Sequence, residues 1–355
     1  MTDPSSTLDA RLQRLARFPL TTLPTPLEEY PRLAAAIGAE RLLIKRDDLT
    51  GLAFGGNKVR ELEYFLGAAK ADGADVFVAG GGVGQSNHAR QCAAAARRAG
   101  LDVHLVLRRG VFGSERVGNL LVTELLGAHI HWTEEDPGLA DRDLLKSEMG
   151  RVVRDLEKAG RRPWLLTSSF HPLGAAAYAL AALELRDQLI NHDIARATVV
   201  CTSMGATRIG IELIVDVVGL EWDVVAVGWR PLDDGLAERL ASLAARTSDL
   251  LGLDWRPEPS RFATRDHGGP AYGVPSEEGM AALRLAAVTE GLLLDPVYTS
   301  KGFAGVIGAL RERAIDPRKP IVFLHTGGLP ALFSYSAELP GPIARGLTSL
   351  TEPRR

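Results

Sequence analysis

Short apolar runs alternate with segments of helical period along almost the whole chain. Regular alternation of strands and helices is typical of mostly parallel sheets that are covered by helices. We therefore expect an α/β fold with two domains, built on mostly parallel twisted sheets. The runs that read as buried strands are 42–44, 76–78, 103–107, 164–166, 199–201, 224–227 and 321–324.

Bulk properties exclude several classes of protein. The 355 residues suffice for two domains, and 46% hydrophobic residues are ordinary for a globular enzyme. The 41 basic and 44 acidic residues nearly balance, and no basic stretch interleaves with aromatic residues, so no nucleic-acid partner is expected. Cys92 and Cys201 lie far apart, which argues against disulfides and zinc sites and fits a reducing compartment. Because we find neither an apolar signal region nor a bilayer-spanning run, we expect a cytoplasmic protein without membrane contact.

A glycine-rich stretch ends on a lysine at a predicted helix start. Gly55, Gly56 and Asn57 precede Lys58, and the apolar stripe of a helix follows at 59, 62, 65, 66 and 69. The helix dipole and a tight pocket both disfavour an ammonium group there, and the glycines let a cofactor approach closely. Lys58 is therefore a candidate Schiff-base nucleophile. The alternative is a surface lysine after a glycine turn.

Two further segments lie between a predicted strand and a predicted helix. Glycines at 80, 81, 82 and 84 suggest a polar loop that leads through Ser86 and Asn87 into an alanine-rich helix, where open α/β sheets bind ligands. The alternative is an ordinary turn with Ser86 or Asn87 as the helix N-cap. The segment 203–207 precedes another helix, and its backbone N–H groups and hydroxyls suit a phosphate. A plain capped helix would explain this segment as well.

Together, the three segments match what pyridoxal phosphate requires. The lysine would hold the aldehyde, the segment 203–207 the phosphate, and the glycine loop would face the substrate carboxylate. Residues 249–275 have little periodicity and are expected to form a long loop near the site. The glycine loops alone would also suit a dinucleotide-binding dehydrogenase, but no convincing acidic residue follows a Gly-x-Gly-x-x-Gly turn.

Five stretches of the chain match known motifs in the right order: residues 44–51, 55–58, 85–88, 295–298 and 325–332. They resemble the 1-aminocyclopropane-1-carboxylate deaminase and D-cysteine desulfhydrase family, which belongs to the tryptophan-synthase-β-like, fold type II pyridoxal-phosphate enzymes. The resemblance runs from about Pro24 to Tyr335. We expect a larger cofactor-binding domain of residues 1–60 and 162–355, a smaller α/β domain of residues 61–161, and a homodimer.

The resemblance implies a role for each matching residue. Lys58 would bind the cofactor as an imine and later move protons, and Asn87 would hydrogen-bond the pyridoxal hydroxyl oxygen. Ser86 would bind the carboxylate of the amino-acid substrate or assist proton transfer. The residues that would hold the phosphate are Ser203, Gly205, Ala206 and Thr207.

Two tyrosines and a histidine complete the predicted site. Tyr272 and Tyr298 would flank the substrate and could polarise a leaving group or the ring. The alternative for each is a core aromatic residue with a satisfied hydroxyl. His88 is a candidate acid or base, or a structural hydrogen-bonding residue in the helix turn. No metal is expected.

Two threonines bear on the substrate. Deaminases of the family typically carry a glutamate where this chain has Thr299, facing the pyridine nitrogen, and a leucine where it has Thr326. A hydroxyl cannot protonate the ring as a carboxylic acid can, so the ring would be a weaker electron sink, as suits elimination of a good leaving group. Both positions look like those of D-cysteine desulfhydrases. The stretch from His171 to Gly174 instead looks like some deaminases, and Phe170 would fill space that other members leave open.

The sequence therefore predicts a pyridoxal-phosphate lyase that eliminates a β-substituent from a small amino acid. The activity would be D-cysteine desulfhydrase-like and would release a keto acid and ammonia. One alternative is a 1-aminocyclopropane-1-carboxylate deaminase or a related enzyme for another β-substituted amino acid. A second is a catalytically weak vitamin B6-binding protein that keeps the fold for regulation.

Overall fold

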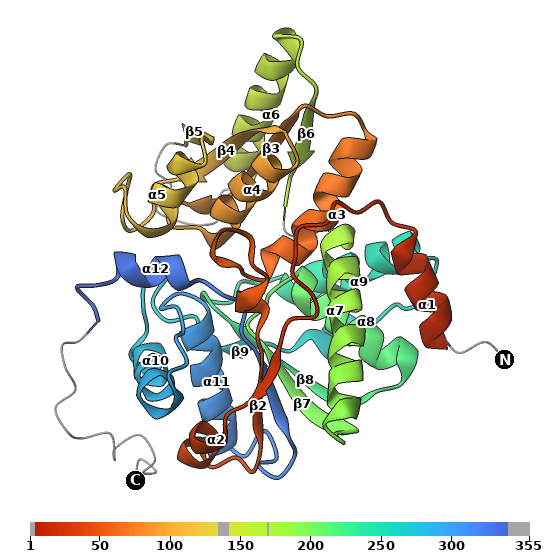
Figure 1. Ribbon diagram of the computed structural model, residues 1–355, viewed down its shortest axis with the longest axis vertical. Helices are drawn as coiled ribbons and strands as arrows, with labels where there is room; N and C mark the ends of the chain where they lie inside the picture. The colour runs from red at the N-terminus through yellow and green to blue at the C-terminus, as the bar shows by residue number, and fades with distance from the viewer. Residues whose placement is uncertain (1–3, 134–141, 169, 340–355) are drawn as a thin grey trace.

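Two sheets form the framework of the molecule (Figure 1). The computed structural model describes residues 4–133, 142–168 and 170–339. One sheet has six strands in the order β1-β2-β10-β7-β8-β9, and the other has four in the order β5-β4-β3-β6. All neighbouring strands in them are parallel except β1 and β2. The predicted α/β fold with mostly parallel sheets is confirmed.

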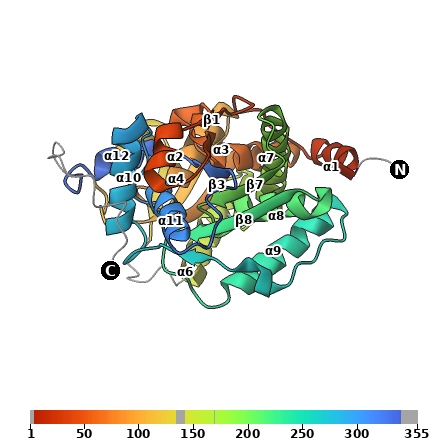
Figure 2. The same cartoon turned by 90° about the horizontal axis from the view of Figure 1, so that it is seen from below.

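The six-stranded sheet is buried on both faces. Successive side chains of a strand point to opposite sides of a sheet. Accordingly, Val322 and Leu324 of β10 join a core cluster with α7, α8 and α9, whereas Phe323 joins a second cluster with α2, α10 and α11. Figure 2 shows these helix sets on opposite sides of the strands. The strands are β1 (Leu27–Glu29), β2 (Leu42–Lys45), β7 (Arg196–Cys201), β8 (Glu221–Gly228), β9 (Arg265–Asp266) and β10 (Ile321–Leu324).

Two of the helices around this sheet, α8 and α9, connect β7 to β8 and β8 to β9, as parallel neighbours require. The helices around it are α2 (Pro31–Ile37), α7 (Pro172–Asn191), α8 (Ala206–Val218), α9 (Leu236–Leu251), α10 (Glu277–Glu290) and α11 (Thr299–Arg311). Several begin or end on residues suited to that position. Ser276 caps α10 by accepting a hydrogen bond from the Gly279 N–H, and Gly219 ends α8 in the left-handed conformation that glycine adopts without strain.

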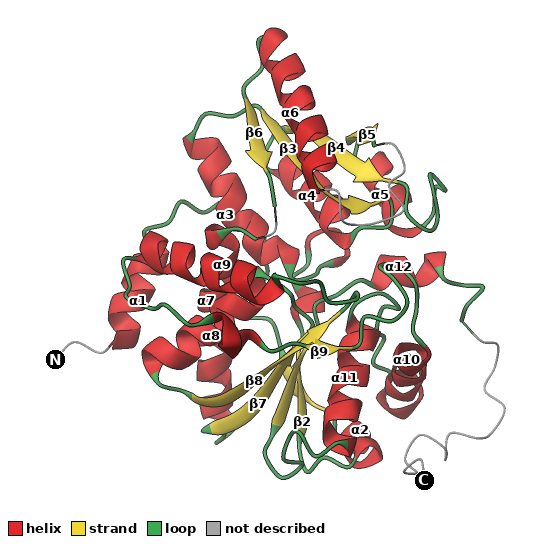
Figure 3. Ribbon diagram, turned by 180° about the vertical axis from the view of Figure 1, so that it is seen from behind, coloured by secondary structure: helices red, strands yellow, loops and turns green. Residues whose placement is uncertain are grey.

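The four-stranded sheet is also covered on two faces. Phe77 and Ala79 of β3 pack with α3 and α4, and Val76 and Val78 pack with α6. The strands are β3 (Val76–Val83), β4 (Asp102–Arg108), β5 (His129–Trp132) and β6 (Pro163–Leu166), and the helices are α3 (Lys58–Ala71), α4 (Asn87–Arg98), α5 (Gly118–Leu125) and α6 (Arg142–Lys158). In Figure 3 this sheet stands above the larger one, and α3 runs from the junction between them.

The predicted glycine loop at residues 80–82 is wrong, because these glycines lie within β3. The strand continues to Val83, and its pairing with β4 shifts register between Gly80 and Gly82. A bulge of this kind leaves one residue unpaired and bends the strand. A Cβ atom on Gly80 would stand 2.4 Å from the Met149 sulfur of α6. Close packing of α6 on β3 therefore accounts for at least one glycine that the sequence suggested for a loop.

Strand β6 extends the smaller part of the molecule. It pairs with β3 along Val76–Ala79, although the predicted boundary assigns residues after 161 to the larger domain. The domain division remains a prediction, and we propose that the smaller domain continues to Leu166.

The remaining elements are short or terminal: α1 (Pro4–Gln13), α12 (Leu329–Ser334) and the 3-10 turns η1 (Asp47–Leu49), η2 (Leu52–Phe54) and η3 (Pro259–Phe262). The predicted long loop at 249–275 thus contains the end of α9, η3 and β9. Among the helices of the described chain, none is long and apolar enough to cross a membrane.

Candidate active site

Loops from three strands of the larger sheet meet at Asn57. Its backbone N–H donates to the Thr326 carbonyl oxygen, in the loop after β10, at 3.0 Å. Its Nδ2 atom donates to the Thr207 hydroxyl at the start of α8, at 3.3 Å. Because Lys58 follows directly, these bonds bring the predicted lysine, the predicted phosphate segment and Thr326 to one place. That place lies at the carboxyl ends of parallel strands, where such sheets bind ligands.

The two glycines before Asn57 are required by the backbone. Gly55 and Gly56 have φ angles of +65° and +123°, which residues with a side chain rarely adopt. A Cβ atom on Gly56 would stand 2.3 Å from Nε2 of Gln91, a residue of α4. The same Nε2 donates to the Gly55 carbonyl oxygen at 3.0 Å. The glycines therefore let α4 of the smaller sheet pack directly against the loop that presents Lys58.

Lys58 is the first residue of α3, as predicted, and it is paired with Glu61 one turn later. The Lys58 Nζ atom lies 2.6 Å from Glu61 Oε1. The Glu61 side chain is fully buried, and its Oε2 atom has no hydrogen-bond partner among the described residues. Burial raises the pKa of the Glu61 carboxyl, and the Lys58 ammonium opposes that shift. Sequence reasoning missed Glu61, although its i,i+3 spacing from Lys58 is the signal for such a pair.

The predicted phosphate segment forms a folded turn before α8. The Ser203 hydroxyl accepts hydrogen bonds from the backbone N–H groups of Gly205 and Arg208, each at 3.3 Å. α8 begins at Ala206, and the first N–H groups of a helix lack partners within the helix. The positive end of the helix dipole adds to their attraction for an anion. A Cβ atom on Gly205 would stand 3.7 Å from the Phe170 ring, so Phe170 lies over this turn.

Ser86 and Asn87 begin α4 and serve as local hydrogen-bonding residues. Ser86 is the N-cap, and its hydroxyl accepts from the Ala89 N–H at 3.3 Å. The Asn87 side-chain oxygen accepts from Asn119 Nδ2 at 2.9 Å. This bond orients the carboxamide and leaves its Nδ2 atom as the group suited to donate to a cofactor oxygen. The capping interpretation of Ser86 is thus confirmed, and it is compatible with a second role.

The two predicted tyrosines lie together and reach Ser86. The hydroxyl oxygens of Tyr272 and Tyr298 are 2.5 Å apart. Burial raises the pKa of both tyrosines, while hydrogen bonds with Tyr298 and Ser86 moderate the shift for Tyr272. Trp229, which no sequence signal indicated, packs edge-on against both rings at centroid distances of 4.8 and 5.2 Å. Because their pKa values are raised, both hydroxyls keep their protons at neutral pH. They form a series of hydrogen bonds that runs from Tyr298 through Tyr272 to Ser86.

Thr299 is bound on both sides by Asp295. The Thr299 hydroxyl donates to Asp295 Oδ1 at 2.7 Å and accepts from the Asp295 backbone N–H at 2.7 Å. The same carboxylate also accepts from the backbone N–H groups of Val297, Tyr298 and Thr299. Asp295 therefore fixes the turn that sets Tyr298 beside Thr299 at the start of α11. The sequence motif contained Asp295, but its role became visible only in the structure.

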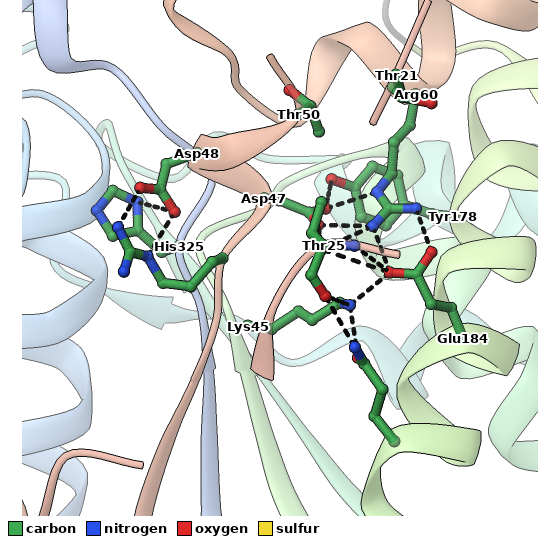
Figure 4. A network of polar contacts seen from close by, with 12 residues as sticks. Thr21, Thr25, Lys45, Asp47, Asp48, Thr50, Arg60, Tyr178, Glu184 and His325 are labelled. Carbon is green, nitrogen blue, oxygen red and sulfur yellow. Dashed lines mark hydrogen bonds and ion pairs between the residues drawn. The ribbon is translucent and has the colours of Figure 1, made fainter. Parts of the chain in front are cut away.

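A buried ionic network supports the segment before Lys58 (Figure 4). The Arg60 guanidinium contacts Asp47 and Glu184 at 2.8 Å, and Lys45 contacts Glu184 at 2.5 Å. Tyr178 of α7 also donates to Asp47, at 2.8 Å. On the other side of the strand in the figure, His325 Nδ1 lies 3.8 Å from Asp48. The network ties α3, β2 and α7 together and holds the predicted cofactor lysine on a rigid support.

The donor set at Asn57 fits pyridoxal phosphate. Lys58 offers an amine for the aldehyde, and the start of α8 with the Ser203 turn offers backbone N–H donors for the phosphate. Beside Lys58, the Glu61 Oε2 atom is buried and finds no hydrogen-bond partner among the described residues. A surface hollow of about 480 Å³ lies elsewhere, lined by residues such as Leu23, Pro24 and Glu184, and contains none of the predicted site residues. An amine and a helix start suited to an anion, together at the edge of a parallel sheet, are the two anchors that pyridoxal phosphate requires of a protein.

Comparisons with known proteins agree with this cofactor. Residues 19–327 match the family model described as pyridoxal-phosphate dependent enzyme. The chain is 34% identical to D-cysteine desulfhydrase of Klebsiella pneumoniae over 337 residues, covering 92% of this chain and 99% of that one. It is 35% identical to 1-aminocyclopropane-1-carboxylate deaminase of Methylobacterium nodulans over 336 residues, covering 91% and 98%. The solved structure of an ACC deaminase homologue superposes on this chain with a TM-score of 0.83 at 31% identity, covering 94% of this chain and 98% of that one.

The chain therefore belongs to the 1-aminocyclopropane-1-carboxylate deaminase and D-cysteine desulfhydrase family of pyridoxal-phosphate-dependent enzymes. The predicted fold type II architecture and the predicted cofactor, pyridoxal phosphate, are confirmed. The two similar relatives carry different activities at nearly equal identity. The choice of substrate within the family therefore depends on this chain's own residues.

Proposed function

We propose that this enzyme eliminates a β-substituent from a small amino acid, with D-cysteine as the best-fitting substrate. Bound pyridoxal phosphate supplies an electron sink for the pair of electrons left when the substrate loses its α-proton. The Cβ–S bond then breaks, and the sulfur leaves with its electron pair and takes up a proton. Water replaces the nitrogen, so that one D-cysteine and one water yield pyruvate, ammonia and hydrogen sulfide.

The binding of Thr299 to Asp295 carries this proposal. The Thr299 hydroxyl uses its only hydrogen in a hydrogen bond to Asp295 Oδ1, so it has none to donate to a pyridine nitrogen. By resemblance, the acid that would protonate this nitrogen in a deaminase belongs at this position. A pyridine ring that is not protonated by an acid is a weaker electron sink. Such a ring suits a substrate whose thiolate leaves readily. Opening a cyclopropane lacks such a leaving group and draws more on the ring.

Each side chain of the site then has a proposed task. Lys58 holds the cofactor and moves the α-proton, and Ser203, Gly205, Ala206 and Thr207 hold its phosphate. Asn87 donates a hydrogen bond from Nδ2 to the ring hydroxyl oxygen, since its own oxygen is engaged by Asn119.

The Tyr272–Tyr298 pair, with Ser86, offers protonated hydroxyls to the substrate carboxylate and leaving group. Thr299 and Thr326 line the ring.

The deaminase alternative rests on the stretch from His171 to Gly174. In the structure, His171 is the N-cap of α7, where its Nδ1 atom accepts from the Leu173 N–H at 3.2 Å. Its ring also packs edge-on against Phe65, at 5.2 Å between centroids. These contacts give the motif a structural use in this chain, which weakens it as an argument for cyclopropane opening.

A side-by-side assay tests the substrate. Purified holoenzyme is given D-cysteine, L-cysteine, β-chloro-D-alanine or 1-aminocyclopropane-1-carboxylate, and keto acid and ammonia are measured. We expect D-cysteine and the chloro analogue to turn over faster than the cyclopropane amino acid. Faster turnover of the cyclopropane substrate would reverse the proposal. The absence of turnover with all of them would favour another β-substituted substrate or the regulatory B6-binding alternative.

Reduction of the holoenzyme with borohydride tests the lysine. Peptide mapping should place the pyridoxyl label on Lys58. Lys301 is the stronger competitor on chemical grounds, because burial lowers the pKa of its amine to about 8. Its Nζ atom is, however, engaged with the Gly268 carbonyl oxygen at 2.6 Å. A label on Lys301 or Lys45 would contradict the assignment.

We also propose a cytoplasmic homodimer. Leu121 and Leu125 of α5 and Phe333 of the neighbouring α12 are exposed at 45%, 83% and 69%, and a second copy would cover them. Light scattering coupled to gel filtration would test the dimer, and a Leu125→Glu variant should weaken it. A monomeric wild-type protein at micromolar concentration would contradict this.

A further inference from the structure

The carboxyl group of Glu61 is placed to exchange a proton with Lys58. Glu61 Oε1 lies 2.6 Å from Lys58 Nζ, within hydrogen-bond reach. The second oxygen, Oε2, is buried and has no hydrogen-bond partner among the described residues. An ionised carboxylate normally accepts bonds on both oxygens when it is buried. The pair at Glu61 therefore depends on a single cation, the ammonium of Lys58.

Among the described residues, Lys58 supplies the positive charge that acts on Glu61. His88 and Cys92 of α4 and Tyr178 of α7 are the titratable groups that act on this pair from the helices packed against α3. Burial and the Lys58 charge lower the pKa of His88 to about 3, so it is neutral at physiological pH. Burial raises the pKa of Cys92 and of Tyr178, so these are neutral too.

Glu61 also borders the predicted phosphate site. A Cβ atom on Gly174 would stand 3.2 Å from both Glu61 Oε2 and the Ala206 Cβ atom. The carboxylate thus lies close to the first residue of α8. A phosphate bound there would bring further negative charge to a carboxylate that is already buried. Both effects favour the neutral acid once the Lys58 ammonium is lost.

We propose that Glu61 stores the proton that Lys58 must give up when it takes the cofactor. This inference rests on the proposed role of Lys58. One proton passes from Nζ to Oε1, so the ammonium–carboxylate pair becomes a neutral amine and a neutral carboxylic acid. The nitrogen lone pair would then be free to attack the aldehyde of the cofactor, and the aldehyde oxygen would leave as water with the two hydrogens of the amine. When the amine is released again, the same proton returns to it without passing through solvent.

Infrared difference spectroscopy on apoprotein tests the proposal directly. Pyridoxal phosphate is added, and binding is followed by absorbance in the same sample. We expect a new carbonyl-stretching band of a protonated buried carboxylic acid, which moves to lower frequency in D2O. The band should correspond to one acid group per bound cofactor. 4′-Deoxypyridoxine phosphate lacks the aldehyde and should produce no such band, because it leaves the Lys58 ammonium in place.

Two variants assign the band. It should vanish in Glu61→Gln and persist in Glu63→Gln, which alters a buried glutamate of the same helix that binds Arg17 and Thr21 instead. Cofactor binding without an acid band overturns the inference while the proposed function stands. A band that persists in Glu61→Gln, or that the deoxy analogue produces equally, overturns it as well. If no cofactor binds to wild-type protein, the proposed function itself fails. The wild-type comparison of the two ligands holds even if a variant does not fold.

Discussion

Burial decides the charge of single side chains around Lys58. His88 is withdrawn from water beside the Lys58 ammonium, and its pKa falls from 6.5 to about 3. Its ring contacts the thiol of Cys92, with the sulfur 3.5 Å from Nε2, rather than a carboxylate that would favour the charged form. His88 is therefore a neutral neighbour of the lysine. This favours the structural alternative for His88 over a role as an acid at neutral pH.

The His88 shift predicts a specific loss of stability in acid. In the unfolded chain the imidazole binds a proton near pH 6.5, whereas in the folded protein it does so only near pH 3. Between these values the unfolded state holds more protons. The free energy of unfolding therefore decreases as the pH is lowered, by at most about 1.4 kcal/mol per pH unit. Urea unfolding of apoprotein should show a shallower fall in His88→Gln. An unchanged slope in His88→Gln would refute the assignment.

At the scale of elements, α3 and α7 depend on each other through Glu184. This glutamate of α7 contacts Arg60 of α3 and Lys45 of β2 at 2.8 and 2.5 Å. Opposite charges hold the pKa of Glu184 below its usual value against the effect of burial. Because Arg60 lies two residues after Lys58, the contact fixes the first turn of α3. The ion pairs therefore position the amine as well as stabilise the fold.

Removal of Glu184 should be strongly destabilising. Glu184→Ala would leave two buried cations with less compensation, and breaking a buried pair in this way costs about 3–5 kcal/mol. Denaturant unfolding of the variant measures that cost. Asp187→Ala is the matched control, because Asp187 lies on the same helix, is 63% exposed and pairs with Arg186. That change should cost about 0–1 kcal/mol. Equal effects of the two substitutions would contradict the role of the network.

Sequence patterns predicted the elements whose signal is local. Lys58 at a helix start, Ser86 as a possible cap and the strand before 203–207 follow from neighbouring residues. Gly80 was wrongly assigned to a loop because the residue that requires a glycine there, Met149 of α6, lies far away in sequence. Trp229 was missed for the same reason, since only the fold brings it to Tyr272. Glu61 had a local signal in its spacing from Lys58, but its burial and its unpaired oxygen are tertiary properties.

At the scale of the whole molecule, the candidate site lies where the two sheets meet. Gln85, before α4 of the smaller part, binds Ser334 of α12 at 3.0 Å through its side-chain oxygen. Ser86 reaches Tyr272, a residue of the larger part. Lys58 and Thr207 belong to segments far apart in the chain, joined through Asn57. A cofactor held at both Lys58 and α8 would therefore link α3 to the core of the larger sheet.

Ligand-dependent stability tests this linkage in the intact protein. A ligand that binds only the folded state at 100 times its dissociation constant stabilises it by about 2.7 kcal/mol. Pyridoxal lacks the phosphate and 4′-deoxypyridoxine phosphate lacks the aldehyde, so each can use only one of the two anchors. At equal concentration, the Tm of the apoprotein should rise most with pyridoxal phosphate. In Lys58→Ala its effect should fall to that of the deoxy analogue, because the covalent anchor is gone.

The phosphate anchor is tested in the same measurement through Thr207→Glu. A carboxylate at the first turn of α8 would repel the phosphate, so pyridoxal phosphate should then stabilise no more than pyridoxal does. Thr289→Glu, near the end of α10, is the matched control and should keep the full difference between the two ligands. If Thr207→Glu also kept it, the phosphate would have to lie elsewhere. Lys58 would then be the one anchor left, and α8 would have no part in linking the cofactor to the larger sheet.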